Sequence, residues 1–296
     1  MTTDFEKIYY NAKAHTYQYG DQMLMPVTSV VKRLTPEFDS DSVLASKMVE
    51  TGRSKSDIQS EWDAKRDYGL DRGTRVHSYI ENVLDGIDQR VLMTINDPLH
   101  EMNQFDMAWT KLQSNLSAVL YKKEWTLGDA ELGIAGRTDA VLDIVVEGQN
   151  QRCLFDWKTG KFMTRKYARE TMLPPFDDLP HCEEVKYSIQ LSLYRLLIER
   201  NLKESYQDGY LLHLPDNKEY QLHKVIDLRS RLEAWLLDLR AKGELGDPDS
   251  DKKGERAGRA IDTVDEDLLK VMSPQARRQL LSRTLKLLNR GRKYLP

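Results

Sequence analysis

The segment LFDWKTGK, residues 154–161, places a carboxylate and an amine two positions apart at the end of an apolar run. Leu154 and Phe155 predict a buried strand. Side chains two positions apart on a strand point to the same face, so Asp156 and Lys158 are expected to lie side by side. This spacing fits either a surface ion pair or a metal site with a catalytic lysine.

A second carboxylate, Asp139, lies on the strand-like segment before this one. If residues 147–150 form the turn between the two strands, Val146 pairs with Gln151 and Asp139 falls opposite Lys158. Two aspartates and a lysine then share one face, and a register slip of one residue would turn Asp139 away. Burying two carboxylates is costly unless a cation neutralises them.

The oxygen atoms of such a site suit Mg²⁺ or Mn²⁺. Asp139 and Asp156 would bind the ion, and the backbone carbonyl of Trp157 could add a ligand. A bound divalent ion lowers the pKa of a water molecule, and Lys158 could orient that water and offset charge in the transition state. The pattern therefore indicates phosphodiester hydrolysis, with an ordinary ion pair of little energetic value as the alternative.

Two pairs of polar residues at helical spacing could complete this site. His77 and Glu81 are four positions apart, which makes them neighbours on one helix face. Gln190 and Tyr194 have the same spacing inside a strongly apolar helix. The first pair could complete a metal shell and the second could hold a nucleic-acid strand. For each pair the alternative is a structural role.

The segments expected to position these residues mix strands and helices, which predicts an α/β fold. A short helix after residue 28 is expected to be capped by Thr28 or Ser29. The long helix is expected to be interrupted near Gly69 and Gly73. The pattern predicts strands at 122–127, 134–146 and 152–157, hairpins at 15–27 and 208–226, and helices at 56–84, 102–116, 185–200 and 228–243.

Composition limits the class of protein. Of 296 residues, 40% are hydrophobic and 31% charged, as in globular proteins with a core. The net charge of −3 excludes a uniformly basic coat, so any nucleic-acid contact must come from local patches. No membrane span, secretory signal or mitochondrial presequence is readable. Two cysteines, Cys153 and Cys182, fit a reducing compartment, so a cytoplasmic location is expected.

The sequence divides into three parts. A domain is expected over 1–245, with a hairpin and helices in 1–120 and the catalytic core in 121–245. A polar linker follows at 246–261 and a basic helical tail at 262–296. The tail could bind a DNA backbone or an acidic partner protein, or it could pack on the domain through its leucines.

Four motifs occur in the order found in a known family: RGTRVHSYIE (72–81), GIAGRTD (133–139), LFDWKTGK (154–161) and YSIQLSLY (187–194). They resemble the motifs of RecB-family exonucleases of the PD-(D/E)XK nuclease superfamily. The stretch MPVTSVVKRL (25–34) is similar to a segment of the mitochondrial genome maintenance exonucleases and their bacteriophage relatives. The resemblance implies a central mixed β-sheet flanked by helices.

The resemblance also implies roles for individual positions. Catalytic roles fall on Lys158, Asp139, Asp156, Gln190 and Tyr194, and metal ligation falls on Asp139, Asp156, Trp157 through its carbonyl, His77 and Glu81. The expected cofactor is Mg²⁺ or Mn²⁺. The four cysteines of the iron–sulfur members are missing, so no iron–sulfur cluster is expected. Thr138 stands where many members have a proline.

Residues beside the motifs are expected to contact DNA: Arg72, Thr74, Arg137, Thr159, Lys161, Arg165 and Lys166. Arg137 could instead pair with a neighbouring acid. Trp62, Tyr68 and Trp157 could stack on bases or lie in the core. The implied function is a metal-dependent exonuclease acting on single-stranded or duplex DNA ends, in recombination, repair or phage DNA processing in a bacterial or phage-infected cytoplasm. The tail at 262–296 could recruit a recombination or single-strand-binding protein. The alternative is a DNA-binding or recombination-partner module that does not cut.

Overall fold

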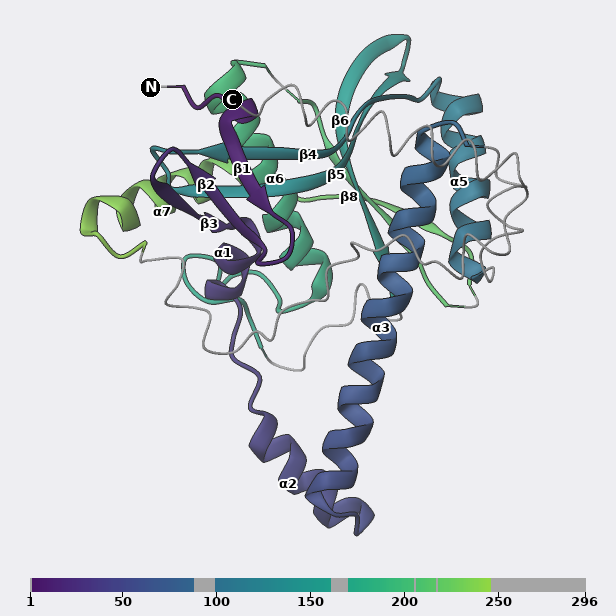
Figure 1. The fold of residues 1–296 in the computed structure, drawn as a ribbon, viewed down its shortest axis with the longest axis vertical. Coiled ribbons are helices and arrows are strands. Elements are labelled where there is room, and N and C mark those ends of the chain that lie inside the picture. The colour runs from purple at the N-terminus through teal and green to yellow at the C-terminus, as the bar shows by residue number, and fades with distance from the viewer. Residues whose placement is uncertain (1, 88–98, 161–169, 205, 217, 246–296) are drawn as a thin grey trace, which may run out of the picture.

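The computed structural model describes residues 2–87, 99–160, 170–204, 206–216 and 218–245 (Figure 1). The strands in these ranges are β1 (Ile8–Asn11), β2 (Thr16–Tyr19), β3 (Gln22–Pro26), β4 (Val119–Asp129), β5 (Ile134–Val146), β6 (Gln149–Thr159), β7 (Gly209–Leu214) and β8 (Gln221–Lys224). The helices are η1 (Phe5–Lys7), α1 (Val27–Arg33), α2 (Ser40–Thr51), α3 (Lys55–Leu84), α5 (His100–Leu116), α6 (Glu183–Leu202) and α7 (Arg229–Lys242). The predicted DNA contacts Lys161, Arg165 and Lys166, the linker at 246–261 and the tail at 262–296 lie outside the described residues.

The strands form one mixed sheet in the order β1-β2-β3-β5-β6-β7-β8, with β4 paired to β5. The pairs β3–β5 and β6–β7 are parallel and the others are antiparallel. β5 pairs with β3 at Ile134 and Ala135 and with β6 from Ala140 onward. Asp139 therefore lies just where β6 leaves β5. The α/β fold with a central mixed sheet, expected from the sequence, is confirmed.

Helices cover both faces of the sheet and enclose two apolar clusters (Figure 1). One cluster joins the sheet to α1, α6 and α7, with Leu154 of β6 among its fully buried members. The other joins the sheet to α3 and α5, and it includes Phe155 and Trp157 of β6. Alternate residues of β6 thus enter opposite clusters, as strand geometry requires.

The turn between β5 and β6 is shorter than the sequence suggested. Glu147 and Gly148 have φ of +52° and +76°, so they form a two-residue turn with left-handed backbone at both positions. Val146 consequently pairs with Gln149, and the predicted pairing with Gln151 is wrong. Because the register differs by two residues and not one, Asp139 still faces β6 on the expected side.

Three helical details also differ from expectation. α3 is continuous from Lys55 to Leu84, so the predicted breaks near Gly69 and Gly73 do not occur. Packing of its second half against α5 and β6 outweighs the poor helix propensity of glycine. α1 begins at Val27 after Pro26, without the predicted Thr28 or Ser29 cap. α2 was not predicted; with the first half of α3 it extends away from the sheet layers (Figure 1).

No described helix combines the length and apolar character needed to cross a bilayer.

Candidate active site

Asp156 and Lys158 form an ion pair on the face of the sheet that α6 covers. Lys158 Nζ lies 2.6 Å from Asp156 Oδ2, and the Asp156 side chain is 2% exposed. Leu154, two residues earlier on β6, packs in the α6 cluster, so strand alternation directs Asp156 and Lys158 to the same side. The spacing in the sequence predicted this arrangement.

Asp139 bridges the point where β5 and β6 separate. Its Oδ2 accepts a hydrogen bond from the backbone N–H of Trp157 at 2.9 Å and lies 3.7 Å from His77 Nδ1. The second imidazole nitrogen, Nε2, is 3.1 Å from the Trp157 carbonyl oxygen. α3 thus brings His77 next to the backbone carbonyl of Trp157, which the sequence predicted to be a metal ligand.

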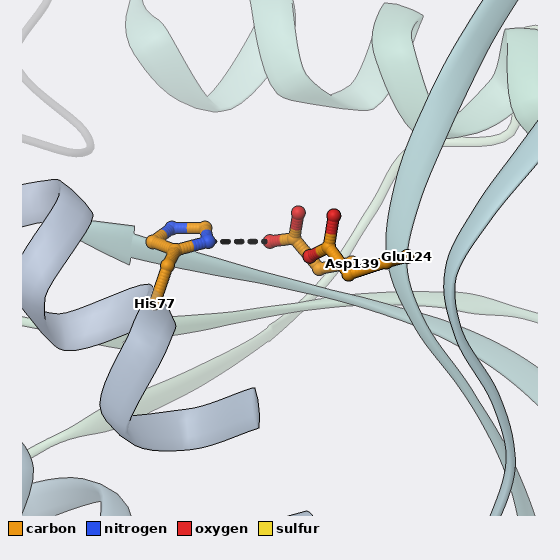
Figure 2. Close-up of side chains that lie close together, drawn as sticks. All are labelled: His77, Glu124 and Asp139. Atoms are coloured by element: carbon orange, nitrogen blue, oxygen red, sulfur yellow. Dashed lines mark ion pairs between the residues drawn. The ribbon is translucent and has the colours of Figure 1, made fainter. Parts of the chain in front are cut away.

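Glu124 of β4 is a member of this site that the sequence did not single out. Lys123 pairs with Ala140 and Trp125 with Thr138, which places Glu124 directly opposite Asp139. Ligand atoms of His77, Glu124 and Asp139 all lie within 4.8 Å of one another (Figure 2). The register between β4 and β5 could have identified Glu124 as a candidate ligand, because it places Glu124 opposite Asp139. Two carboxylates that face each other on adjacent strands repel unless a cation lies between them.

Two carboxyl groups of the site, those of Glu124 and Asp156, have raised pKa values. Burial, reinforced by the carboxylate of Asp139 and opposed by Arg137, raises the pKa of Glu124 to about 8. Burial also raises the pKa of Asp156 to about 6, against the effect of the Lys158 ammonium. Burial lowers the pKa of Lys158, but Asp156 and Asp139 raise it by more, and the net shift is upward. Burial disfavours the charged form of each carboxyl group, and a cation bound beside them would favour it.

The donor set fits a divalent cation. Ligand atoms of an octahedral Mg²⁺ at about 2.1 Å from the ion are about 3 to 4 Å apart, so small side-chain adjustments bring His77, Glu124 and Asp139 to one ion. Asp156 lies beside this group with its carboxylate held by Lys158. Carboxylate oxygens with one imidazole suit Mg²⁺ or Mn²⁺.

Glu81, the remaining predicted ligand, lies near the group without joining it. Its carboxylate interacts electrostatically with His77 and Asp139, and burial raises its pKa. Lys123 holds this part of α3, because its Nζ donates to the Glu81 carbonyl at 3.1 Å and pairs with Asp85 at 2.8 Å. Glu124, and not the predicted Glu81, thus joins His77 and Asp139 in the group of candidate ligands.

The predicted pair on α6 lies over the same region. Gln190 Nε2 donates to the Tyr194 hydroxyl at 3.1 Å, and Tyr194 is 2% exposed. A Cβ atom on Gly136 would lie 2.6 Å from the Tyr194 ring, so the glycine of the GIAGRTD motif makes room for this tyrosine. Spacing alone did not identify this close approach between Gly136 and Tyr194.

The predicted DNA contacts within the described residues take different positions. Arg137 Nε pairs with Glu124 Oε2 at 2.9 Å, and its guanidinium lies over the Tyr10 ring. Thr159 lies beside Gly73 of α3. Thr74 is exposed and donates back to the Leu70 carbonyl. Arg72 joins α3 to the fully buried Glu101 and to Asp216. Trp157 is 2% exposed and packs in the core, so its ring has no face for a base.

Two solved structures and one family model are similar to this chain. A solved structure of a candidate exonuclease from Eubacterium rectale is 14% identical and has a TM-score of 0.37; the match covers 66% of this chain and 72% of that one. The structure of SSO0001 is also 14% identical, with a TM-score of 0.26 over 49% of this chain and 58% of its own. The search of curated proteins gives no match. The family model of the PD-(D/E)XK nuclease superfamily matches residues 50–260, more than half of the chain. The chain therefore belongs to the PD-(D/E)XK nuclease superfamily.

Proposed function

We propose that this protein is a Mg²⁺- or Mn²⁺-dependent deoxyribonuclease that hydrolyses phosphodiester bonds from DNA ends. The observation that carries the proposal is the convergence of His77, Glu124 and Asp139 beside the Asp156–Lys158 pair. α3 and the three consecutive strands β4, β5 and β6 supply these groups. A structural ion pair would need only Asp156 and Lys158.

The residues take separate roles. His77, Glu124, Asp139, Asp156 and the Trp157 carbonyl would hold the ion, which supplies Lewis acidity and lowers the pKa of a bound water. Lys158 places its ammonium where it can orient the attacking water and offset the charge that develops on the phosphoryl oxygens. No other described ammonium comes as close to Asp156.

Substrate contacts surround this centre. Arg137 pairs with Glu124 through Nε and lies over the Tyr10 ring, and its guanidinium would bind a phosphate oxygen through the Nη atoms. Gln190 would contact the DNA strand, together with Thr159 and Thr74, and the buried Tyr194 would hold the Gln190 amide in place through its hydroxyl. Arg72 contributes as a support for α3, because Glu101 and Asp216 engage its guanidinium.

Action on DNA ends, and membership of the branch close to mitochondrial genome maintenance and bacteriophage exonucleases, rest on the resemblance of the four motifs and of residues 25–34. A role in recombination, repair or phage DNA processing rests on the same resemblance. We further propose that residues 1–245 form the nuclease domain and that residues 262–296 form a basic tail that binds DNA or a partner protein.

The test compares labelled linear and closed-circular DNA incubated with Mg²⁺, Mn²⁺ or EDTA. Shortening of linear DNA only, dependent on metal, is expected. Asp156→Ala should abolish cleavage and weaken Mn²⁺ binding, whereas Lys158→Ala should retain Mn²⁺ binding and lose most of the rate. A folded protein that binds DNA but never shortens it would favour the non-cleaving module. Equal cutting of circular DNA would replace the exonuclease with an endonuclease.

A further inference from the structure

Lys158 has a second neighbour besides Asp156. Its Nζ lies 4.7 Å from the centre of the Tyr187 ring, over the ring face. Tyr187 belongs to α6, one turn before Gln190 and two turns before Tyr194. The side chain of Lys158 is 19% exposed, so a carboxylate and an aromatic face both hold a largely buried ammonium.

The Tyr187 ring is itself oriented by its helix. Its hydroxyl interacts with Glu183, one turn earlier in α6, and Glu183 pairs with Lys186. The ring packs against the apolar cluster beneath α6. A lysine side chain loses rotamer entropy when it is fixed in one position. Because the Tyr187 ring is already in place, less of this entropy has to be lost when the substrate binds.

The two holds on Lys158 differ in how they respond to a cation. Asp156 lies beside the candidate metal ligands, and any charge that it shares with an ion weakens its attraction for the ammonium. The Tyr187 ring carries no net charge and attracts the ammonium through its quadrupole. This attraction does not compete with a metal or with a phosphate oxygen, so it remains when the site is loaded.

We propose that Tyr187 is the positioning residue of Lys158: its ring face keeps the ammonium beside the scissile phosphate after metal and DNA have bound. This inference rests on the proposed nuclease function. It adds Tyr187, one turn closer to the N-terminus of α6, to the Gln190–Tyr194 pair on the same helix. The hydroxyl is not needed for this role, since the interaction uses the π face.

The kinetic test uses Tyr187→Phe and Tyr187→Leu in the full-length protein. Tyr187→Phe keeps the π face and should cut DNA within about twofold of the parent. Tyr187→Leu should lower kcat about 3- to 30-fold, the range that corresponds to a partly desolvated cation–π contact, with KM and Mn²⁺ affinity within about twofold of the parent. Tyr210→Leu is the matched control, because Tyr210 stacks on Phe155 and packs against the apolar cluster on the other face of the sheet. It should leave kcat unchanged.

A double-mutant cycle separates positioning from mere packing. In the Lys158→Ala background the ring has no ammonium to hold, so adding Tyr187→Leu should cause no further loss of rate. An equal loss in both backgrounds would show that Tyr187 only supports α6. Parental kcat in Tyr187→Leu would also overturn the proposal.

A readout without substrate keeps the inference distinct from the nuclease assignment. In protein with ¹³C-labelled lysine, the ring current of Tyr187 should shift the Lys158 ε-methylene proton signals upfield. The upfield shift should persist in Tyr187→Phe and should vanish in Tyr187→Leu. It should also persist in the parent at saturating Mg²⁺, which is used here in place of Mn²⁺ because Mg²⁺ is diamagnetic. Loss of the shift on adding Mg²⁺ would refute the claim that the ring keeps its hold in the loaded site. Failure of the parent to cut DNA would instead remove the proposed function while this shift remained.

Discussion

Glu124→Gln should change stability and metal affinity in opposite directions. The folded protein raises the pKa of Glu124 from its ordinary 4.5 to about 8. Between these values the folded state holds a proton that the unfolded state has released, so the free energy of unfolding falls as pH rises from 4.5 to 8. Below pH 4.5 this penalty is absent. Glutamine has nearly the same shape and no charge, so it removes the penalty.

The magnitude follows from the width of that pH window. Each pH unit within it contributes about 1.4 kcal/mol, which gives about 4 kcal/mol at pH 7.5. The ion pair with Arg137, whose side chain is 35% exposed, is already contained in this value, because Arg137 lowers the pKa of Glu124. Glu124→Gln should therefore stabilise the metal-free protein by roughly 2–4 kcal/mol at pH 7.5 and by almost nothing at pH 4.5.

The assays are urea unfolding in EDTA across pH 4.5–8.5 and titration calorimetry with Mn²⁺. Removing one ligand charge should weaken Mn²⁺ binding by tenfold or more, since even partners of metal ligands contribute about 10- to 100-fold. Glu131→Gln is the control, because Glu131 is a largely exposed acid in the turn after β4 that pairs with Arg200. It should change neither quantity appreciably. A metal-free Glu124→Gln protein less stable than the parent at pH 7.5, or parental Mn²⁺ affinity, would refute the assignment of Glu124.

Three further changes test the fold and the tail. Gly136→Ala places a Cβ 2.6 Å from the Tyr194 ring and 3.1 Å from Val27 Cβ, so it should destabilise the protein by about 1–3 kcal/mol in urea unfolding; Gly69→Ala, with nothing within 4 Å, should stabilise it by about 0.5–1 kcal/mol. Arg72→Ala leaves the fully buried Glu101 without its cation and should cost about 3–5 kcal/mol in the same assay, whereas an arginine that only bound DNA would cost almost nothing. Removal of residues 262–296 should flatten the salt dependence of DNA binding by about 0.9 for each lost phosphate contact on duplex DNA, or about 0.7 on single strands, and an unchanged slope would assign the tail to protein contacts.

Local patterns predicted most of the elements. The strand at 134–146 matches β5 at both ends, because its apolar residues are bounded by Gly133 and by the turn at Glu147. The α5, α6 and α7 boundaries lie within two residues of the predicted helices, since long periodic segments fix their own limits. Spacing within one strand likewise placed Asp156 beside Lys158.

Features that depend on pairing between elements were harder to predict. The β5–β6 register was predicted from an assumed four-residue turn, and Gly148 with its left-handed φ shows that a two-residue turn was available. The ion pair between Arg72 and Glu101 joins helices that are distant in the sequence, and no local spacing announces it. Glu124 depends on the register of β4, which shifts at a bulge between Leu120 and Lys122.

Glu124 destabilises the metal-free protein in two ways, through charge repulsion and through backbone strain. It faces the carboxylate of Asp139 across the strand pair, and its φ of +46° is a backbone conformation that a glutamate seldom adopts. Strain of this kind costs on the order of 1–3 kcal/mol and persists where the surroundings require the side chain to point in one direction. Glycine would remove the strain and threonine the repulsion, but neither would bring a carboxylate to His77 and Asp139. A cation bound at this point would offset the repulsion and would be coordinated by the carboxylate that the strained backbone directs there. Glu124, absent from the sequence motifs, is therefore the strongest structural argument for the proposed metal site.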